Sequence, residues 1–171
     1  RTKLAGEQAI QAVDSNYLIF RTSWVYGARG KNFYLTMLRL AREQEEIRVV
    51  DDQIGAPTWC RMIAESTALI LSQGINRSEG FNGYFEERKG IYHMTAGGQT
   101  SWYGFAERIF KSIPDSDRKL KQLIPIVSRE YPTAAIRPMS SILDNKNVEE
   151  TYGIKICNWN RFLIEMDSCY R

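Results

Sequence analysis

Hydrophobic residues follow two spacings along this chain, one typical of amphipathic helices and one typical of short buried strands. In residues 33–46 apolar side chains recur three or four positions apart with charges between them, which predicts an amphipathic helix. Leu4, Ile10 and Val13 are spaced for one face of a helix that is already under way at the first residue. Residues 17–20 form instead a continuous apolar run, which is typical of a buried parallel strand.

The rest of the chain alternates between these two kinds of element. Ser101 is expected to cap a helix over residues 102–111, and Thr58 to cap a helix that runs through residue 70. Residues 123–127 have strand character, but their central proline predicts an edge strand or an irregular extended piece. Residues 73–90 are rich in glycine and polar side chains and are expected to be a connection. Further strands are predicted at 47–50 and 91–94, and further helices at 145–152 and 159–166. The alternation indicates an α/β fold, although no glycine-rich loop follows the first strand.

Composition narrows the classes of function. The 171 residues include 23 Lys and Arg against 20 Asp and Glu, so the net charge of +3 is small, and we expect no nucleic-acid partner. No apolar run approaches the roughly 18 residues that span a bilayer, so we expect no membrane partner. Three cysteines and one histidine match no zinc spacing, so we expect no metal ligands and a reducing, cytoplasmic location. The length suits one domain, or a piece of a larger protein.

Unusual polar and aromatic residues gather on four loops. They lie at residues 1–3, 21–27, 51–58 and 129–138. Two of these loops follow predicted strands, and open α/β sheets bind ligands at the carboxyl ends of their strands. The last loop carries two arginines on extended backbone, which suits a diphosphate. Taken singly, each cluster fits a structural role as well as a binding role, since a tryptophan can fill a core and arginines can form surface ion pairs. Their joint placement favours a binding site.

Two other features have ordinary explanations. Residues 27–31 contain two glycines and a lysine, but they lack the four-residue spacer and the Ser or Thr of a phosphate loop. They are expected to form a strand-to-helix turn. His93 lies between apolar residues of a predicted strand, so we expect a packed histidine instead of a general base.

Five motifs, in this order, resemble the dTDP-4-dehydrorhamnose reductases, a family of extended short-chain dehydrogenases/reductases. The motifs lie at residues 1–7, 21–27, 30–33, 50–58 and 131–138. The resemblance implies the carboxyl-terminal half of such an enzyme, with the last parallel strands of a Rossmann-type fold and a smaller mixed α/β substrate-binding lobe. Residues 1–50 would complete the Rossmann-type domain. Residues 51–171 would form mainly the substrate-binding lobe, with segments that return to the Rossmann part. The cofactor-binding half, with its glycine-rich loop, would precede Arg1.

The same resemblance assigns roles to individual residues. Lys3 matches the lysine of the family's Tyr-x-x-x-Lys pair, whose tyrosine would lie before Arg1. Its ammonium group would lower the pKa of that catalytic tyrosine and hold the nicotinamide ribose. Thr22 and Ser23 would lie near the nicotinamide, and Trp24 would form a wall of the pocket against the deoxysugar. Further substrate-binding residues are expected to be Asn32, Gln53, Gly55, Pro57, Thr58 and Arg137.

The activity implied by the resemblance is reduction of dTDP-4-dehydro-L-rhamnose to dTDP-L-rhamnose with NADPH or NADH, for surface polysaccharide synthesis. The partner would be a dTDP-sugar, and residues 1–171 alone would be inactive. Because a metal ion assists dimerisation in some relatives, a homodimer and Mg²⁺ in the full-length protein stay open. Two alternatives also stay open: a related nucleotide-sugar epimerase or reductase, and a non-catalytic regulatory subunit of the same fold.

Overall fold

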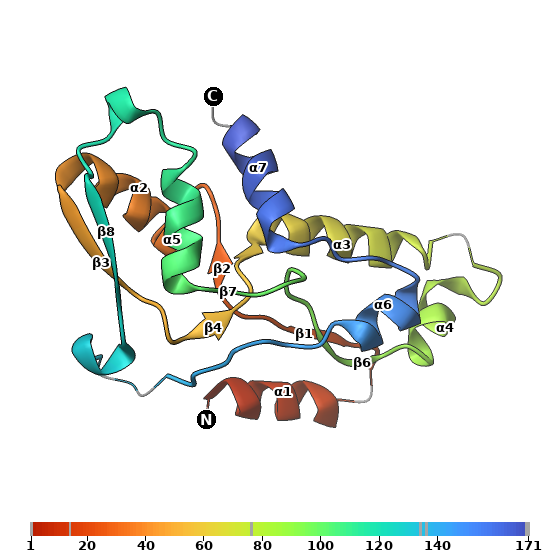
Figure 1. The fold of residues 1–171 in the computed structure, drawn as a ribbon. Coiled ribbons are helices and arrows are strands. Elements are labelled where there is room, and N and C mark those ends of the chain that lie inside the picture. Colours follow the sequence, from red (N-terminus) through yellow and green to blue (C-terminus); the bar gives the residue numbers. More distant parts are fainter. Residues whose placement is uncertain (1, 14, 76, 134, 136, 170–171) are drawn as a thin grey trace.

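The computed structural model describes residues 2–13, 15–75, 77–133, 135 and 137–169, and it has the mixed α/β architecture expected from the sequence (Figure 1). Arg1, the first residue of the first motif, lies outside the described residues. The helices are α1 Thr2–Ala12, α2 Phe33–Glu43, α3 Cys60–Ser72, α4 Gly80–Glu86, α5 Trp102–Phe110, α6 Lys146–Tyr152 and α7 Trp159–Cys169. Two 3₁₀ turns lie at Asp115–Asp117 and Ser128–Glu130.

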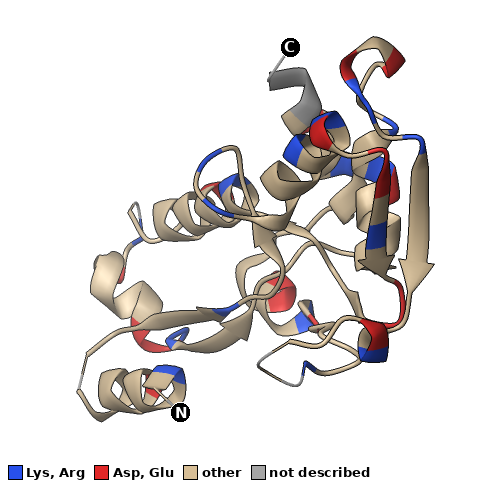
Figure 2. Ribbon diagram, turned by 90° about the vertical axis from the view of Figure 1, so that its left-hand side faces the viewer, with Lys and Arg blue, Asp and Glu red and all other residues tan. Residues whose placement is uncertain are grey.

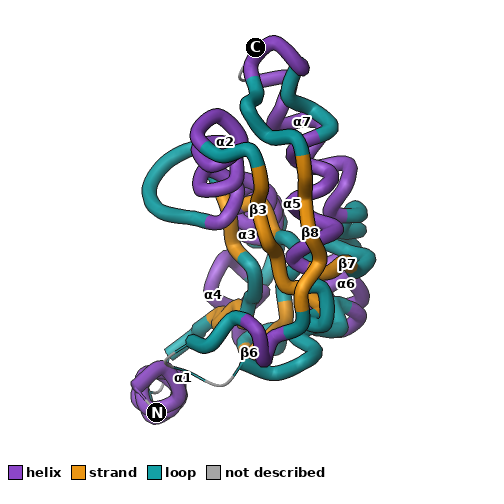
Figure 3. The backbone as a smooth tube through the Cα atoms, turned by 60° about the vertical axis from the view of Figure 1, so that its left-hand side comes forward, coloured by secondary structure: helices purple, strands orange, loops and turns teal. Residues whose placement is uncertain are grey.

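The strands associate in pairs, and the two longest pairs are parallel. β1 (Leu18–Arg21) pairs with β6 (Gly90–His93), and β3 (Glu46–Val50) pairs with β8 (Gln122–Ile126). β3 and β8 run side by side in Figure 3, and α5 packs against both of them and against α2. Two shorter pairs join β2 (Val25–Tyr26) in parallel to β5 (Thr58–Trp59), and β4 (Ile54–Gly55) in antiparallel orientation to β7 (Thr100–Ser101). These two-residue strands have no signal in the hydrophobic pattern.

The core lies where α5 meets its neighbours. Phe105, Ile109 and Met94 are completely buried there, together with Leu163 of α7. Acidic and basic residues are interspersed along the elements in Figure 2, in keeping with the small net charge. Within the described residues, no helix is long and apolar enough to cross a membrane.

The expected cap at Ser101 is confirmed. Its hydroxyl oxygen accepts a hydrogen bond from the Gly104 N–H at 2.9 Å, which satisfies one of the free donors in the first turn of α5. Pro125 lies within β8, whose one partner strand in the described part of the chain is β3, so the predicted edge position is also confirmed.

Three expectations about the elements are wrong. Thr58 does not cap α3, because it lies in β5 and Trp59 occupies the cap position without a side-chain bond. The helix predicted over 33–46 ends at Glu43, because the backbone of Gln44 is already extended on the way into β3. The connection at 73–90 contains α4, whose glycines hide its helical pattern; Gly74, in the turn after α3, lets the Phe85 ring of α4 pack against the backbone.

Candidate functional site

The loop after β1 and the loop before α3 meet at Trp24. Trp24 has a left-handed backbone with φ of 51°, an uncommon conformation for a bulky residue. Its carbonyl oxygen accepts a hydrogen bond from the Thr58 N–H at 3.1 Å, and the next residues pair with β5. The structure therefore brings together two of the loops that the sequence singled out.

The Trp24 indole packs between groups from three distant segments. Its ring stacks on Trp102 with a centroid distance of 3.5 Å and an angle of 5° between the planes. A Cβ atom at Gly55 would lie only 2.4 Å from Cε2 of Trp24, so the ring rests directly on the backbone of β4. The indole N–H donates to Oγ of Ser141 at 3.4 Å, and Oγ of Ser23 donates to the Ser141 carbonyl at 3.1 Å.

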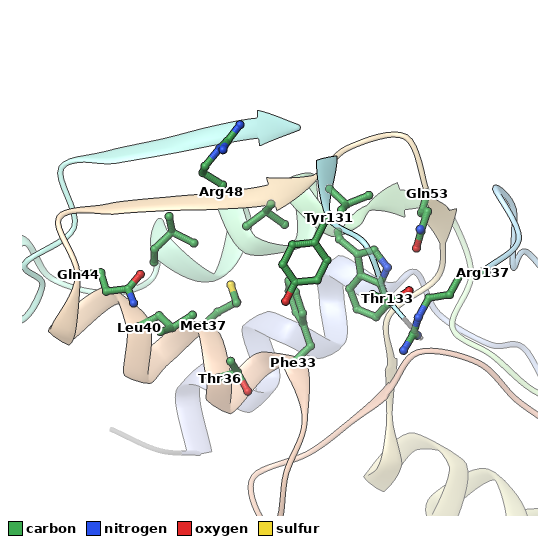
Figure 4. Close-up of a pocket in the computed structure, with 14 residues that line it drawn as sticks. Phe33, Thr36, Met37, Leu40, Gln44, Arg48, Gln53, Tyr131, Thr133 and Arg137 are labelled. Carbon is green, nitrogen blue, oxygen red and sulfur yellow. The ribbon is translucent and has the colours of Figure 1, made fainter. Parts of the chain in front are cut away.

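A cavity of about 650 Å³ lies beside this stack, between α2 and β3. Its apolar lining residues are Phe33, Met37, Leu40, Ile47, Val49, Val50, Trp102 and Tyr131. Its polar lining residues are Thr36, Gln44, Arg48, Gln53, Thr133 and Arg137. In Figure 4, Gln53 and Arg137 lie at one end of the cavity and Gln44 at the other. Such a volume, mostly apolar with a few polar groups, is typical of a small-molecule site.

A hydrogen-bond chain holds Gln53 in place at the cavity. Its amide nitrogen donates to Oγ of Ser128 at 2.9 Å, and the Ser128 hydroxyl donates to the Asp52 carboxylate at 2.5 Å. The backbone N–H of Ser128 donates to both oxygens of the same carboxylate at 2.9 Å. The Ser128 hydroxyl and then its N–H favour the charged form, so they hold the pKa of Asp52 below its usual value.

The two predicted phosphate-binding arginines lie in different surroundings. Arg137 lines the cavity from the segment that leads to Ser141. Arg129 lies in a 3₁₀ turn and does not line the cavity, so the structure does not place the two guanidinium groups together there.

Lys3 lies on exposed α1, which is attached to the end of β1 by an ion pair. Glu7 and Arg21 approach to 2.6 Å, and this pair lowers the pKa of Glu7 and raises that of Arg21. Lys3 precedes Glu7 by one helical turn and therefore shares its face of the helix. In Figure 1, α1 lies beneath β1 and runs in the opposite direction. The N-terminal end of α1 therefore lies on the side of the carboxyl end of β1, which Thr22 directly follows.

Three of the predicted substrate-binding residues have structural contacts that occupy their side chains or bury them. Asn32 caps α2, since its side-chain oxygen accepts from the Leu35 N–H and its amide group donates to the carbonyls of residues 27 and 29. Pro57 and Thr58 are buried and do not line the cavity. The Thr58 hydroxyl donates to the Ala56 carbonyl and accepts from the Ala96 N–H. The roles expected for these three residues stay predictions.

Sequence reasoning assigned no site role to Trp102, Phe33 or Tyr131, which also form this region. The sequence pattern predicts Trp102 only as the start of a helix, whereas in the structure its ring lines the cavity and stacks on Trp24. Phe33 follows the cap of α2, and its ring lies 4.6 Å from that of Trp102. Their positions in the sequence could have identified Phe33 and Trp102, because each is the first residue of a helix and directly follows the polar residue that caps it. Within the described residues, no cluster of three or more metal-ligating side chains occurs.

Comparisons with known proteins show which sequences and structures this chain is similar to. A family model described as RmlD substrate binding domain matches residues 1–169. A dTDP-4-dehydrorhamnose reductase of Burkholderia thailandensis is 44% identical over 162 residues, which are 92% of this chain and 53% of that protein. The enzyme of the same name from Escherichia coli K12 is 38% identical over 160 residues, or 92% of this chain and 51% of its own.

A solved structure shows the same relationship. The dTDP-4-dehydrorhamnose reductase of Bacillus anthracis, in complex with NADP, superimposes with a TM-score of 0.80 at 33% identity. The match covers 96% of this chain and 52% of that one. The chain thus spans about half the length of the relatives that it matches.

Proposed function

Since this chain belongs to the family of RmlD substrate-binding domains, we propose that it forms the substrate-binding half of a nicotinamide-dependent dTDP-4-dehydrorhamnose reductase. The substrate would be dTDP-4-dehydro-L-rhamnose and the product dTDP-L-rhamnose. We use the term full-length enzyme for the protein in which a cofactor-binding half precedes these residues. A homodimer and a cytoplasmic location stay predictions, and we propose no Mg²⁺ site.

The observation that carries the proposal is the cavity beside the Trp24–Trp102 stack. Its apolar floor and its aromatic side chains Phe33 and Tyr131 suit a flat nucleobase. Arg137 can donate paired hydrogen bonds to a diphosphate at one end of the cavity. Trp24, next to this end through its stack on Trp102, is only half-buried, so the uncovered part of its apolar indole can contact a deoxysugar. One dTDP-sugar can occupy all three surfaces in that order.

The residues of this chain also suit the reducing step. A bound nicotinamide cofactor supplies the hydride that reduces the keto carbon of the sugar. Lys3 is exposed, and Thr22 is exposed at the end of β1 on the side where α1 is attached, so both groups are available to a cofactor there. In the proposed enzyme, the Lys3 ammonium stabilises the phenolate of a tyrosine four residues before it, so the phenol becomes a better proton donor at neutral pH. The proton goes to the oxygen of the reduced carbonyl group.

The test is turnover by the full-length enzyme, followed as loss of the reduced nicotinamide absorbance with dTDP-4-dehydro-L-rhamnose. We expect turnover, and a fall of at least 100-fold for Lys3→Met, in the range that acid–base catalysis contributes. Lys31→Met is the matched control, because Lys31 lies exposed in the turn before α2 and does not line the cavity. Absence of turnover with Lys3 intact would contradict the proposal. Tight dTDP-sugar binding without turnover would indicate the regulatory role, and turnover of UDP- or GDP-sugars alone would indicate another 4-keto sugar reductase.

A further inference from the structure

We propose that Trp102 is a positioning residue for the reaction: it holds the Trp24 indole in the orientation in which that ring meets the sugar. The proposal rests on the proposed function and adds to it a residue that acts through another. It arises from the nearly parallel stack of two indoles whose Cα atoms lie in different elements, one in the loop after β1 and one at the start of α5.

Trp24 needs external support to keep its position. Its backbone adopts a left-handed conformation that bulky side chains rarely take, and this fixes the direction in which the side chain leaves the loop. The backbone itself is held by the bond from the Thr58 N–H. For the ring, the polar contact is a long hydrogen bond of 3.4 Å to Ser141, so ring packing supplies most of the remaining restraint.

Trp102 is well placed to supply this packing because its own position is fixed. Ser101 caps the helix at the residue before it, and the Phe33 ring packs at 4.6 Å against the Trp102 ring. Phe33 is itself stacked at 5.5 Å on the completely buried Phe105. The aromatic contacts therefore run from the core through Phe33 and Trp102 to Trp24.

Gly55 shows how closely this arrangement is fitted. With a side chain at this position, the Trp24 ring could not stay where it is, since a Cβ atom would approach its Cε2 atom to 2.4 Å. The ring is thus limited by the backbone of β4 and by the Trp102 ring. Because Trp102 also lines the neighbouring cavity, one side chain contacts both the proposed nucleotide site and the proposed sugar wall.

The test is a double-mutant cycle on kcat in the full-length enzyme, with Trp24→Ala, Trp102→Ala and the double variant. If Trp102 acts through Trp24, Trp102→Ala lowers kcat by roughly three- to ten-fold, the range expected from loss of a stacked aromatic pair. The double variant then has the kcat of Trp24→Ala within about two-fold, because the two changes remove one interaction. Trp102→Phe, which keeps a ring at the stack, restores most of the lost kcat. The Kd for dTDP, measured separately, reports the direct contribution of Trp102 to the cavity.

Circular dichroism provides a readout of the stack that needs no activity. Two stacked indoles give a coupled pair of bands of opposite sign, which we expect in the unmodified enzyme and expect to be lost in both Trp24→Phe and Trp102→Phe. Trp159→Phe is the matched control that keeps the bands, because Trp159 packs on Phe105 and does not line the cavity. Absence of the bands from the unmodified enzyme, or effects on kcat that multiply in the double variant, would overturn the proposal. Inactivity of the unmodified enzyme would instead show that the proposed function has failed.

Discussion

Thr58 offers a direct test of whether a residue in a recognisable motif serves the substrate or the fold. Its side chain is completely buried; the hydroxyl donates to the Ala56 carbonyl at 2.9 Å and accepts from the Ala96 N–H at 3.1 Å. Thr58→Val keeps the shape of the side chain and removes both bonds. The Ala96 N–H, at a residue only 2% exposed, is then left without this acceptor.

The cost follows from these contacts. A buried donor without a partner costs about 1–3 kcal/mol, and with the loss of a second bond we expect about 2–3 kcal/mol in the free energy of unfolding. For a chain of this size that lowers Tm by about 5–10 °C. Thr58→Ser is the matched control, because it keeps the hydroxyl and loses one methyl group, at a cost of about 1 kcal/mol.

Urea titration and thermal unfolding measure both variants, and the Kd for dTDP is measured under conditions in which each is folded. We expect Thr58→Val to lose more stability than Thr58→Ser and to bind dTDP as the unmodified protein does. A Val variant of unchanged stability with weakened dTDP binding would refute this reasoning and would return Thr58 to the substrate site.

Three further predictions concern the surroundings of the cavity. Gly55→Ala should lower kcat in the full-length enzyme about as much as Trp24→Ala does, because the new Cβ displaces the Trp24 ring; unchanged kcat would contradict the close packing of Trp24 on Gly55. Because the folded-state pKa of Asp52 is depressed, its ionised form stabilises the fold above the unfolded pKa near 3.8, and this contribution disappears as the pH falls through the folded pKa. Urea titrations should therefore show Asp52→Asn less stable than the unmodified protein at pH 7, with a difference that shrinks as the pH falls below about 3.8 and vanishes only below the folded pKa; a difference independent of pH would contradict the assignment to the Ser128 contacts. Arg137→Gln should weaken dTDP binding about ten-fold at low salt and less at high salt, measured by calorimetry, whereas an equal loss for thymidine would show that Arg137 does not contact the diphosphate.

The hydrophobic pattern predicts the long helices and strands well, because the spacing of apolar residues shows directly which face of each element is buried. They predict element ends less well, as Ser101 and Thr58 illustrate. Both are hydroxyl residues just before an apolar helical pattern, but only Ser101 has an extended backbone directly before its helix and bonds to its third residue. Thr58 lies one position too early and is drawn into β5 by its pairing with Val25.

The candidate site was predictable where motif resemblance identified a residue, and not where its role depends on distant partners. Gln53 and Arg137 line the cavity, as a substrate contact would require, although their roles stay predictions. Trp102 carries no local signal beyond an apolar position at a helix start. Its contact with Trp24 depends on how α5 packs on α2 and β3, and no periodicity in the sequence encodes that placement.

The pairing of the strands also has a consequence for synthesis of the protein on the ribosome. Among the described residues no pair of strands is a hairpin: Leu18 pairs with Gly90 and Glu46 with Gln122. Such non-local pairs require closure of long loops before any contact repays the lost entropy, which slows folding. During synthesis β3 leaves the ribosome well before β8, because about 70 residues separate the two strands in the sequence. Until β8 is available, the backbone groups on the β3 edge that β8 later covers have no strand partner. We expect the nascent chain to depend on rapid elongation through residue 126, or on chaperones, to a degree that a hairpin-rich protein of the same size would not.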